Sequence, residues 1–417
     1  MYKRKLFQIV NKYSSRHEVI LLTGPRQSGK TTLLKWVGQN SRNYVSLDDL
    51  EIRSLAKNNP KLFLERFLPP IIIDEFQYAP NLLPYVKLKV DEIRTSTHFS
   101  EPVSYWLTGS QNFSMMEEVQ ESMAGRVLIL KLLGLDLSEL QQQDDLLYRP
   151  PFFERPKENF EKKEKSSLAD LFEIILKGDK PEVWFKKMGR EETSLYYSSY
   201  IQTYLERDVR LQLGIKELGL FEKFMRLLAS RVGQLLNMAS LASEVGVKGP
   251  TIKSWLTILE RSFQIVILKP YYQNLNKREV KTPKVYFLDT GLVTHLLKWI
   301  DPQQAACGPM AGSLFENWVV SEIIKTYWHA GQEAPLYFWR TQDGDEMDLV
   351  YEHGKILEMA EIKLNDSPSP GFFSPIEKVF EKIKKSHLTL GRCRVVTPSL
   401  KSFPLSEKGE AVSAWSL

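Results

Sequence analysis

The chain has 417 residues, too long for one ordinary domain, which indicates roughly two to four domains with sizeable cores. Its composition, 43% hydrophobic and 26% charged, has no long low-complexity tract and excludes a largely disordered chain. The formal net charge of +5 is too mild to indicate a nucleic-acid or acidic partner by itself.

The cysteine content and the N-terminal stretch indicate the compartment. Cys307 and Cys393 are the only cysteines, and two isolated thiols suit a reducing cytosol better than a disulfide scaffold. Polar residues from Asn11 onward interrupt the first apolar stretch before a signal-peptide core forms. No run approaches the ~18 to 20 apolar residues that span a bilayer. We expect a soluble, cytoplasmic protein without membrane association.

A nucleotide-binding loop is predicted near the N-terminus. The stretch HEVILLTGPRQSGKTTLLKW indicates a short apolar strand, a Gly-rich turn and a helix that opens at Lys30. The turn fits the pattern GxxxxGK[ST] in its required strand-loop-helix context, and a chance Gly-rich turn is the alternative. Such a loop cradles phosphates with its backbone N–H groups, while its hydroxyl binds magnesium. The predicted nucleotide-binding residues are Gly24, Pro25, Arg26, Gln27, Ser28, Gly29, Lys30, Thr31 and Thr32, with Thr31 as a magnesium ligand.

A second buried strand ends in two acids. In LPPIIIDEFQYAP, three isoleucines come directly before Asp74 and Glu75. Continuous apolar runs suit strands buried on both faces of a parallel sheet, and the polar residues at their carboxyl ends face the ligand. Asp74 is therefore predicted to hold the magnesium ion and Glu75 to polarise the attacking water. A helix cap is the alternative.

Two further groups are candidates for the ATPase site. A third strand, VSYWLTGSQN, leads into Ser110 and Gln111, which are predicted to sense the terminal phosphate or to orient water. A plain turn explains either residue equally well. Arg126 in SMAGRVLILKL is predicted to reach a neighbouring subunit's phosphate, and a surface ion pair is an equal alternative.

These motifs carry a family resemblance. The runs LLTGPRQSGKTTLL, IIIDEFQYAPNLL, LTGSQNF and SMAGRV resemble the AAA-superfamily P-loop ATPases of prokaryotes whose C-terminal domain has long been labelled as of unknown function. YIQTYLERDVR, YFLDTGLVTHLL, GSLFENWVVSEI and the closing EIK extend the resemblance over nearly the whole chain. It implies an ATP- and Mg²⁺-dependent ATPase that forms a homo-oligomer, a hexamer or another ring. LLGLDLSEL departs from the Pro-Leu-Ser version of related chains, a change that touches no catalytic residue.

The middle of the chain contains a candidate DNA-binding module. Residues 141–165 combine Gln, Pro and dense charge, a composition that buries little and indicates a junction. Further on, two short helices around the turn 246–249 precede an apolar hairpin with a basic tip, the layout of a winged helix-turn-helix. A helical lid with solvated lysines is the alternative. The residues predicted to contact DNA phosphates are Lys248, Lys253, Lys277, Arg278, Lys281 and Lys284.

A second candidate metal site lies in GDEMDLVYEHGKILEMAEIK. If residues 353–354 form the centre of an even-length turn, Glu346 faces Glu361 and Asp348 faces Met359. Acids crowded on one sheet face destabilise the pairing unless a cation compensates, and Mg²⁺ or Mn²⁺ would do so. An odd turn would separate Asp348 from Glu361. The residues predicted to share this face are Glu346, Asp348, Glu361 and Lys363.

A helix upstream contributes a further acid. GSLFENWVVSEIIKTYW predicts a helix in which Glu316 shares an inward stripe with Val319, Val320 and Ile323. The alternative is a capping box, in which Glu316 bonds back to the amide of Ser313.

The order helix Glu, Asp348, Glu361-x-Lys363 resembles the PD-(D/E)xK nuclease core. The resemblance implies that Asp348 and Glu361 ligate Mg²⁺ or Mn²⁺, that Lys363 is the catalytic lysine and that Glu316 is the helix acid. Glu346 matches the frequent Glu-x-Asp, whereas the Pro before the Asp is missing. A degenerate nuclease fold that binds DNA or only packs is the alternative.

Together these observations predict an α/β protein in four parts. They are a P-loop parallel-sheet ATPase domain at 1–140, a linker or insertion with a helical lid at 141–215, a winged-helix-like domain at 216–290 and a restriction-endonuclease-like domain at 291–417. The predicted function is that of an oligomeric, DNA-binding ATPase with a metal-dependent nuclease-like domain, acting in DNA processing, repair or defence. The alternative is a regulatory or remodelling ATPase whose degenerate nuclease-like domain binds DNA or a protein partner without cleavage.

Overall fold

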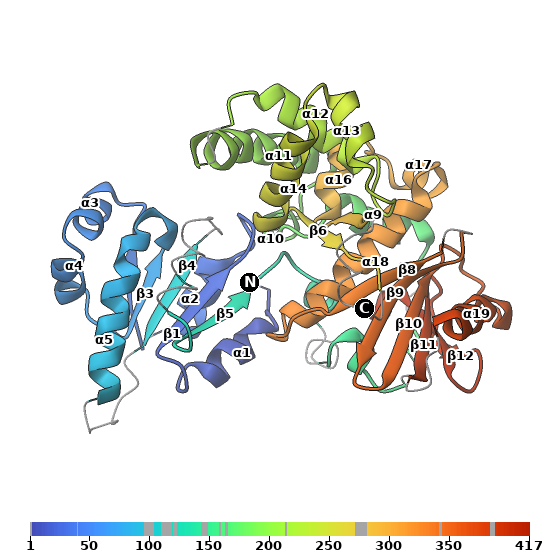
Figure 1. Cartoon of the computed structure of the whole chain (residues 1–417), viewed down its shortest axis with the longest axis horizontal. Coiled ribbons are helices and arrows are strands. Elements are labelled where there is room, and N and C mark those ends of the chain that lie inside the picture. Colours follow the sequence, from blue (N-terminus) through green and yellow to red (C-terminus); the bar gives the residue numbers. More distant parts are fainter. Residues whose placement is uncertain are drawn as a thin grey trace. The chain divides into compact units, whose positions relative to one another are not determined.

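The computed structural model divides into two compact units (Figure 1). The first unit comprises Met1–Leu135, Arg261–Phe263 and Trp328–Gln332, and the second comprises Asp136–Glu260, Gln264–Tyr327 and Glu333–Leu417. The structure describes residues 2–39, 41–95, 104–109, 119, 123–142, 149–157, 160–162, 166–212, 215–271, 282–341, 344–383 and 388–417.

The first unit is built on a five-stranded parallel sheet with the order β2-β3-β4-β1-β5. Successive residues of its central strand point to opposite faces, so Val19 and Leu21 join one hydrophobic cluster while Ile20 and Leu22 join another. This burial on both faces confirms the predicted parallel sheet. The strands are β1 (Val19–Thr23), β2 (Asn43–Ser46), β3 (Ile71–Asp74), β4 (Tyr105–Gly109) and β5 (Val127–Lys131).

Helices cover both faces of this sheet. Side chains of α1 (Leu6–Tyr13) and α2 (Lys30–Val37) pack against Ile20 and Leu22. The opposite face is covered by α3 (Leu50–Asn58), α4 (Pro60–Arg66) and α5 (Leu83–Thr95). Because all strands are parallel, the carboxyl ends of β1 and β3 meet at one edge, where the Gly-rich loop and Asp74 follow them.

The second unit begins with a helical region. Its helices are α7 (Leu137–Gln141), α9 (Leu168–Lys177), α10 (Pro181–Phe185), α11 (Arg190–Tyr204), α12 (Leu218–Ala229), α13 (Met238–Val245), α14 (Gly249–Arg261), α16 (Thr290–Leu296) and α17 (Pro302–Cys307). A π-helical segment, Leu205–Gln212, continues α11. An antiparallel pair, β6 (Ile265–Leu268) and β7 (Lys284–Phe287), follows α14.

The chain ends in a mixed six-stranded sheet with the order β12-β13-β11-β10-β9-β8. Its strands are β8 (Leu336–Arg340), β9 (Glu346–His353), β10 (Ile356–Ile362), β11 (Thr389–Thr397), β12 (Phe403–Pro404) and β13 (Gly409–Ser413). The pairs of β11 with β10 and with β13 are parallel, and the other pairs are antiparallel. Phe380 of α19 (Ser374–Ile383) packs against Met359 and Cys393 of this sheet.

A long helix, α18 (Ala311–Trp328), precedes this sheet and is buried on nearly all sides. Two of its charged residues, Glu322 and Lys325, are buried, where Lys325 pairs with Glu322 at 3.0 Å and with Asp179 at 3.1 Å. The predicted α/β class, the parallel sheet of the first unit and the helical middle are thus confirmed, and the C-terminal domain contains a mixed sheet. The winged-helix and restriction-endonuclease-like assignments stay predictions. The boundaries expected at residues 140, 215 and 290 stay predictions.

The segment expected to bury little surface does so only in part. In its described portion, Phe152 and Phe153 are buried, and the Phe153 ring stacks on Tyr351 at a centroid distance of 5.1 Å. The nearby guanidinium of Arg155 donates to the carbonyl of Ser416 at 2.9 Å. The expectation was wrong here, since a count of prolines and charges does not reveal that an aromatic pair docks onto a distant strand.

Close packing between α11 and α16 gives a test of the fold. An alanine Cβ at Gly291 would lie 2.3 Å from the Tyr197 hydroxyl oxygen. That hydroxyl is held within 3.0 Å of the Asp289 carboxylate and 3.1 Å of the Lys177 carbonyl, so it cannot retreat freely. We predict that Gly291→Ala lowers the free energy of unfolding by about 1–3 kcal/mol, measured by urea unfolding. The control is Gly312→Ala in α18, where a Cβ meets nothing within 4 Å, and its stability should be unchanged or higher.

Candidate functional site

The Gly-rich loop between β1 and α2 is shaped by close backbone contacts. Gly24 has a φ of 152°, and a Cβ there would lie 2.0 Å from the carbonyl oxygen of Leu132. Only glycine fits, because a side chain would collide with the backbone of the neighbouring segment. The Lys30 ammonium is buried and donates to the carbonyls of Gly24 and Pro25, at 3.1 and 2.7 Å. The loop and its lysine therefore form one compact unit at the N-terminus of α2.

The predicted magnesium ligands of the nucleotide site lie together. The Thr31 hydroxyl donates to the Asp74 carboxylate, with distances of 2.9 and 3.1 Å to its two oxygens. The Tyr44 hydroxyl on β2 donates to the same carboxylate at 2.8 Å. Hydroxyl and carboxylate oxygens are the ligands that magnesium prefers, so these residues fit the ion that ATP carries. Tyr44 was missed, since only the pairing of β2 with β3 brings it to Asp74.

Arg4 is a second residue that sequence reasoning missed. Its buried guanidinium donates to the loop carbonyl of Ser28 at 2.8 Å. It also donates to the carbonyls of Leu133 and Gly134, at 2.8 and 3.1 Å. An arginine that lies outside the motif thus holds the loop in place, and no local pattern marks it.

Glu75 follows Asp74 in a left-handed conformation with a φ of 54°. Such a backbone is uncommon for a residue with a side chain, and strained residues of this kind cluster at functional sites. Its carboxylate accepts a hydrogen bond from the Gln77 side-chain amide, and burial raises its pKa. A helix cap does not describe this residue. Its predicted role in polarising water stays a prediction.

The remaining ATPase candidates differ in what the structure describes. Ser110 and Gln111 lie outside the described residues. Arg126 forms a two-pronged ion pair with Asp91 on α5, with N–O distances of 2.7 and 3.2 Å. Within one chain it is therefore engaged in the surface ion pair named as the alternative.

The residues predicted to contact DNA phosphates differ in their exposure and in whether the structure describes them. Lys248 and Lys253 are exposed, on the turn before α14 and on α14 itself, where they are accessible to a phosphate backbone. Lys277, Arg278 and Lys281 lie outside the described residues. Contact of Lys248 and Lys253 with DNA stays a prediction.

Lys284 does not lie on an exposed wing, so its assignment to DNA was wrong. It is the first residue of β7 and is 2% exposed. Its ammonium lies 3.2 Å from Glu316, 2.5 Å from Glu346 and 3.7 Å from Asp348. The error arose because a count of positive charges cannot distinguish a wing tip from the buried start of the returning strand.

The hairpin β9–β10 has the predicted parity but a different register. His353 pairs with Ile356 across a two-residue turn, and Leu349 pairs with Ala360. Both predicted facing pairs are wrong, because Met359 pairs with Val350 and Ala360 with Leu349, a register in which Glu346 does not face Glu361. Extending this register by one residue brings Asp348 opposite Glu361. The Asp348 carboxylate accepts a hydrogen bond from the Ile362 N–H at 2.8 Å. The turn is even, so both acids stay on one face.

Glu316 belongs to the acidic cluster and not to a cap. Helix α18 begins at Ala311, which places Ser313 inside the helix and excludes the capping box. The Glu316 carboxylate instead accepts hydrogen bonds from the Tyr286 hydroxyl at 2.7 Å and from Lys284. A Cβ at Gly233 would lie 3.2 Å from both carboxylate oxygens, so the neighbouring backbone approaches this acid closely.

Burial and like charge determine the protonation of this cluster. Burial, and then the nearby Asp348, raise the pKa of Glu316 to about 7, and the same two causes raise that of Glu361 to about 7. Burial also raises the pKa of Asp348, and the Lys284 ammonium works in the opposite direction. Burial disfavours the charged form of Lys284. The surrounding carboxylates outweigh this effect, so the pKa of Lys284 is raised.

The cluster has features that fit a divalent cation. Glu361 is 6% exposed, and its Oε2 atom has no hydrogen-bond partner among the described residues. Its Oε1 atom lies 2.5 Å from the ammonium of Lys363. A buried carboxylate oxygen without a partner is costly unless a cation binds it. The structure thus brings together the predicted helix acid Glu316, the predicted metal ligands and the predicted lysine. Glu346 contacts this cluster through Lys284 and also forms an ion pair with Arg340 at 3.1 Å.

Comparison with known proteins assigns the first unit. Residues 16–141 match the model of an AAA domain, and two domains of unknown function, DUF8612 and DUF4143, match residues 168–303 and 311–417. An uncharacterized protein of Mycobacterium tuberculosis is 30% identical over 402 residues, which cover 96% of this chain and 80% of the mycobacterial one. An uncharacterized protein of Mycobacterium bovis matches with the same values. The chain belongs to this family of AAA-domain proteins.

Among solved structures, the Walker-type ATPase of Pyrococcus abyssi is similar with a TM-score of 0.44 and 15% identity. The match covers 71% of this chain and 96% of the archaeal chain. The family match supports the predicted ATPase resemblance, with an AAA domain followed by the two domains of unknown function. In the described part of the chain, no helix has the length and apolar content needed to cross a membrane.

The acidic cluster predicts a pH dependence of stability. Since the folded-state pKa values of Glu316 and Glu361 are raised from 4.5 to about 7, the folded protein holds more protons than the unfolded chain between these values. The stability that these two groups contribute is present below their ordinary pKa and is lost as the pH rises through about 7. We predict that Glu361→Gln lessens the fall in melting temperature between about pH 5 and about pH 8.

The matched control is Glu377→Gln, which changes an exposed carboxylate on α19 and should leave the wild-type pH profile in place. Equal pH profiles for wild type and Glu361→Gln would show that Glu361 is not held at a raised pKa.

Proposed function

We propose that the protein is an ATP-hydrolysing enzyme that acts on DNA, with a metal-dependent nuclease-like site in its C-terminal sheet domain. The observation that carries the DNA-cleaving half is the convergence of Asp348 and Glu361, with an unpartnered buried oxygen on Glu361. The ATPase half rests on the Thr31–Asp74 contact beside the Gly-rich loop and on the AAA-domain match.

The nucleotide site supplies binding and orientation. The backbone of residues 24–29 and the Lys30 ammonium would cradle the phosphates of ATP, while Thr31 and Asp74 would hold its magnesium ion. Magnesium neutralises charge on the phosphates when it is bound. Glu75 is fixed by Gln77 and has a raised pKa, which suits a carboxylate that accepts a hydrogen bond from the attacking water.

The nuclease-like site would hold Mg²⁺ or Mn²⁺ between Asp348 and Glu361. The chemistry that such an ion would supply is polarisation of the phosphodiester and a lower pKa of a bound water molecule. The Ile362 N–H orients the Asp348 carboxylate, and Lys363 holds its ammonium beside Glu361, where it would face a phosphate. Glu316 is oriented by Tyr286 and would complete the acid set.

DNA binding is supported by the middle region. Helices α13 and α14 and the pair β6–β7 follow one another in the order of a winged helix-turn-helix (Figure 1). Lys248 and Lys253 are exposed on the second of these helices and its preceding turn, where they would contact phosphates.

Assembly into a ring is part of the proposal. Arg126 would act on a neighbouring subunit's nucleotide if its ion pair with Asp91 opened. Both side chains of this pair are partly exposed, and such pairs contribute little to stability, so its opening costs little.

A second function is favoured by one observation. The Lys284 ammonium already lies among Glu316, Glu346 and Asp348, where it compensates their charge without a metal ion. This arrangement favours a regulatory or remodelling ATPase whose nuclease-like domain binds DNA or a protein partner without cutting.

A cleavage and binding panel tests the first function. The full-length protein is incubated with linear, supercoiled and branched DNA, with and without ATP and Mn²⁺. We predict Mn²⁺-dependent nicking that Asp348→Asn abolishes, and ATP hydrolysis that Lys30→Ala reduces about a hundredfold or more. Glu377→Gln is the matched control for a lost carboxylate, and each variant's melting temperature shows whether it is folded.

The outcomes separate the two functions. Nicking that is unaffected by Asp348→Asn would assign the cleavage to a contaminant. A protein that hydrolyses ATP but leaves all three DNA forms intact would remove the nuclease half and leave the second function.

Replacing Lys284 tests whether its ammonium occupies a position that a metal ion can take among the carboxylates. We predict that Lys284→Met, without metal, loses about 3–5 kcal/mol of stability because the buried carboxylates lose their partner. Mn²⁺ should restore much of this loss, measured by urea unfolding at several metal concentrations. Lys378→Met, which removes an exposed lysine paired with Asp345, is the control. A loss that Mn²⁺ does not reverse would favour the second function.

A further inference from the structure

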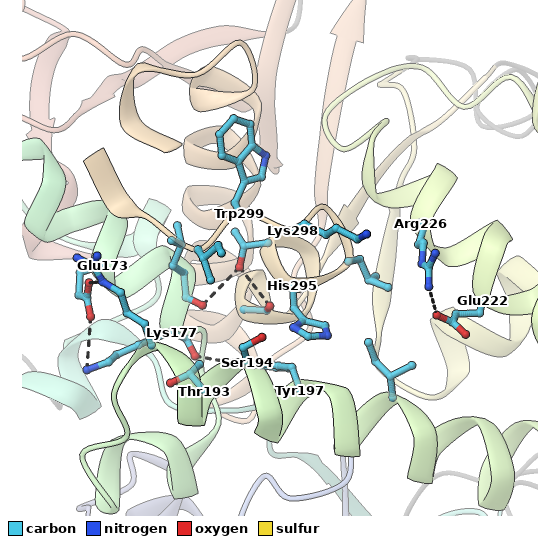
Figure 2. Close-up of a pocket in the computed structure, with 17 residues that line it drawn as sticks. Glu173, Lys177, Thr193, Ser194, Tyr197, Glu222, Arg226, His295, Lys298 and Trp299 are labelled. Atoms are coloured by element: carbon cyan, nitrogen blue, oxygen red, sulfur yellow. Dashed lines mark hydrogen bonds and ion pairs between the residues drawn. The ribbon is translucent and has the colours of Figure 1, made fainter. Parts of the chain in front are cut away.

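A cavity of about 370 Å³ lies within the helical region of the second unit (Figure 2). It is bordered by residues of α9, α11, α12 and α16 and by the segment after α16. Its volume is in the range of small-molecule pockets, ~300–1,000 Å³. None of its lining residues belongs to the Gly-rich loop or to the acidic cluster, so neither proposed activity accounts for it.

The lining carries an excess of positive charge. Its four cationic side chains are Lys177, Arg190, Arg226 and Lys298, against two carboxylates, Glu173 and Glu222. Both carboxylates are already paired, Glu222 with Arg226, and Glu173 with Lys177 and Arg190. The exposed ammonium of Lys298 makes no hydrogen bond or ion pair with any residue that the structure describes. Arg190 has a further carboxylate partner, Asp301, at 2.9 Å, so the charge left uncompensated is that of Lys298, and it would attract an anion to this cavity.

A buried hydroxyl in the lining lacks a partner. Thr193 on α11 is 7% exposed, and its Oγ1 atom has no hydrogen-bond partner in the described part of the protein. A buried polar atom of this kind is costly unless a ligand or water satisfies it. The next residue, Ser194, brings a second hydroxyl to the same cavity. The cavity therefore offers hydroxyl donors together with ammonium and guanidinium groups.

The aromatic side of the cavity suits a flat, apolar ring system. Tyr197 and His295 stack with their ring centroids 6.2 Å apart, and Trp299 lies above them in Figure 2. Tyr197 is fixed by its contacts to Asp289 and the Lys177 carbonyl, and Trp299 packs close to Gly308. Rigid aromatic walls bind ring systems with little loss of side-chain entropy.

We propose that this cavity is the binding site of a small organic phosphate with a ring system, of about mononucleotide size. Arg226 and Lys298 bind the phosphate, since the guanidinium forms charge-assisted hydrogen bonds to its oxygens and the ammonium adds a point charge. The ring lies against His295 and Trp299, and the Thr193 hydroxyl, which Figure 2 shows at the opposite end of the cavity from Arg226, donates to a polar atom at the other end of the ligand.

A neighbouring cavity leaves room for the rest of such a ligand. It measures about 410 Å³ and shares Ile201, Glu222, Arg226 and His295 with the first. Its lining also includes Leu205 and Glu206, the first residues of the π-helical segment that continues α11. Arg226 lies at the junction of the two cavities, where one guanidinium can contact a phosphate from either side.

The test uses adenosine 5′-monophosphate as the probe for the full-length protein in isothermal titration calorimetry. We expect saturable binding that Arg226→Gln and Lys298→Gln each weaken at least about tenfold, because each removes a charged phosphate contact. Thr193→Val, which is nearly isosteric, should weaken it about fivefold. Adenosine and inorganic phosphate, each lacking one half of the probe, should both bind more weakly.

Two controls separate this site from the rest of the protein. Lys186→Gln breaks an exposed ion pair with Glu182 that has the same helical spacing as Arg226–Glu222, and neither residue lines either cavity, so binding should be unchanged. Lys30→Ala disables the Gly-rich loop and should leave the cavity's affinity for the probe intact. This outcome does not depend on whether the protein cleaves DNA or hydrolyses ATP.

Three results would overturn the proposal. The first is an absence of binding heat. The second is binding that Lys30→Ala abolishes and that Arg226→Gln and Lys298→Gln leave unchanged. The third is binding of adenosine as tight as that of its monophosphate. The first excludes a site for this chemistry, the second moves the probe to the Gly-rich loop, and the third removes the role of the phosphate.

Discussion

The C-terminal half of the protein depends on keeping several carboxylates out of water. Glu316, Asp348 and Glu361 lie on α18, β9 and β10, where burial raises their pKa values, and the charged forms of Glu316 and Asp348 are stabilised by a positive charge beside them. Lys284 supplies that charge from β7, a strand whose sequence neighbours belong to the helical region. One ammonium therefore connects the helical region with the sheet, and any metal ion that enters the cluster must share the carboxylates with it.

The nucleotide site is built by a different rule. Parallel strands bring their carboxyl ends to a single edge, so the loop after β1 and the acid after β3 meet without any long-range ion pair. The parallel strand order brings the first turn of α2, which carries Thr31, to the end of β3, which carries Asp74. This is why short motifs were sufficient to predict the loop, the contact of Thr31 with Asp74 and the fold of the first unit, with Tyr44 as an addition that only sheet pairing reveals.

The second site could be predicted only in part. The alternation of acids in the hairpin predicted which side chains share a face, because side-chain direction depends on parity. The register itself shifted, since the turn uses Gly354 and Lys355 and not the expected pair, and this depends on local turn geometry. Lys284 was misassigned because its partners lie far away in the chain. Arg4 carried no signal at all, as an isolated arginine before a helix has no motif.

Arg4 also has a consequence for how the chain leaves the first unit. Its guanidinium holds the carbonyl of Ser28 in the loop and the carbonyls of Leu133 and Gly134, which lie at the end of the first unit's continuous chain. The loop and the departing chain therefore share one hydrogen-bond donor. A displacement of the loop would thus reach, through Arg4, the segment by which the polypeptide leaves the parallel sheet.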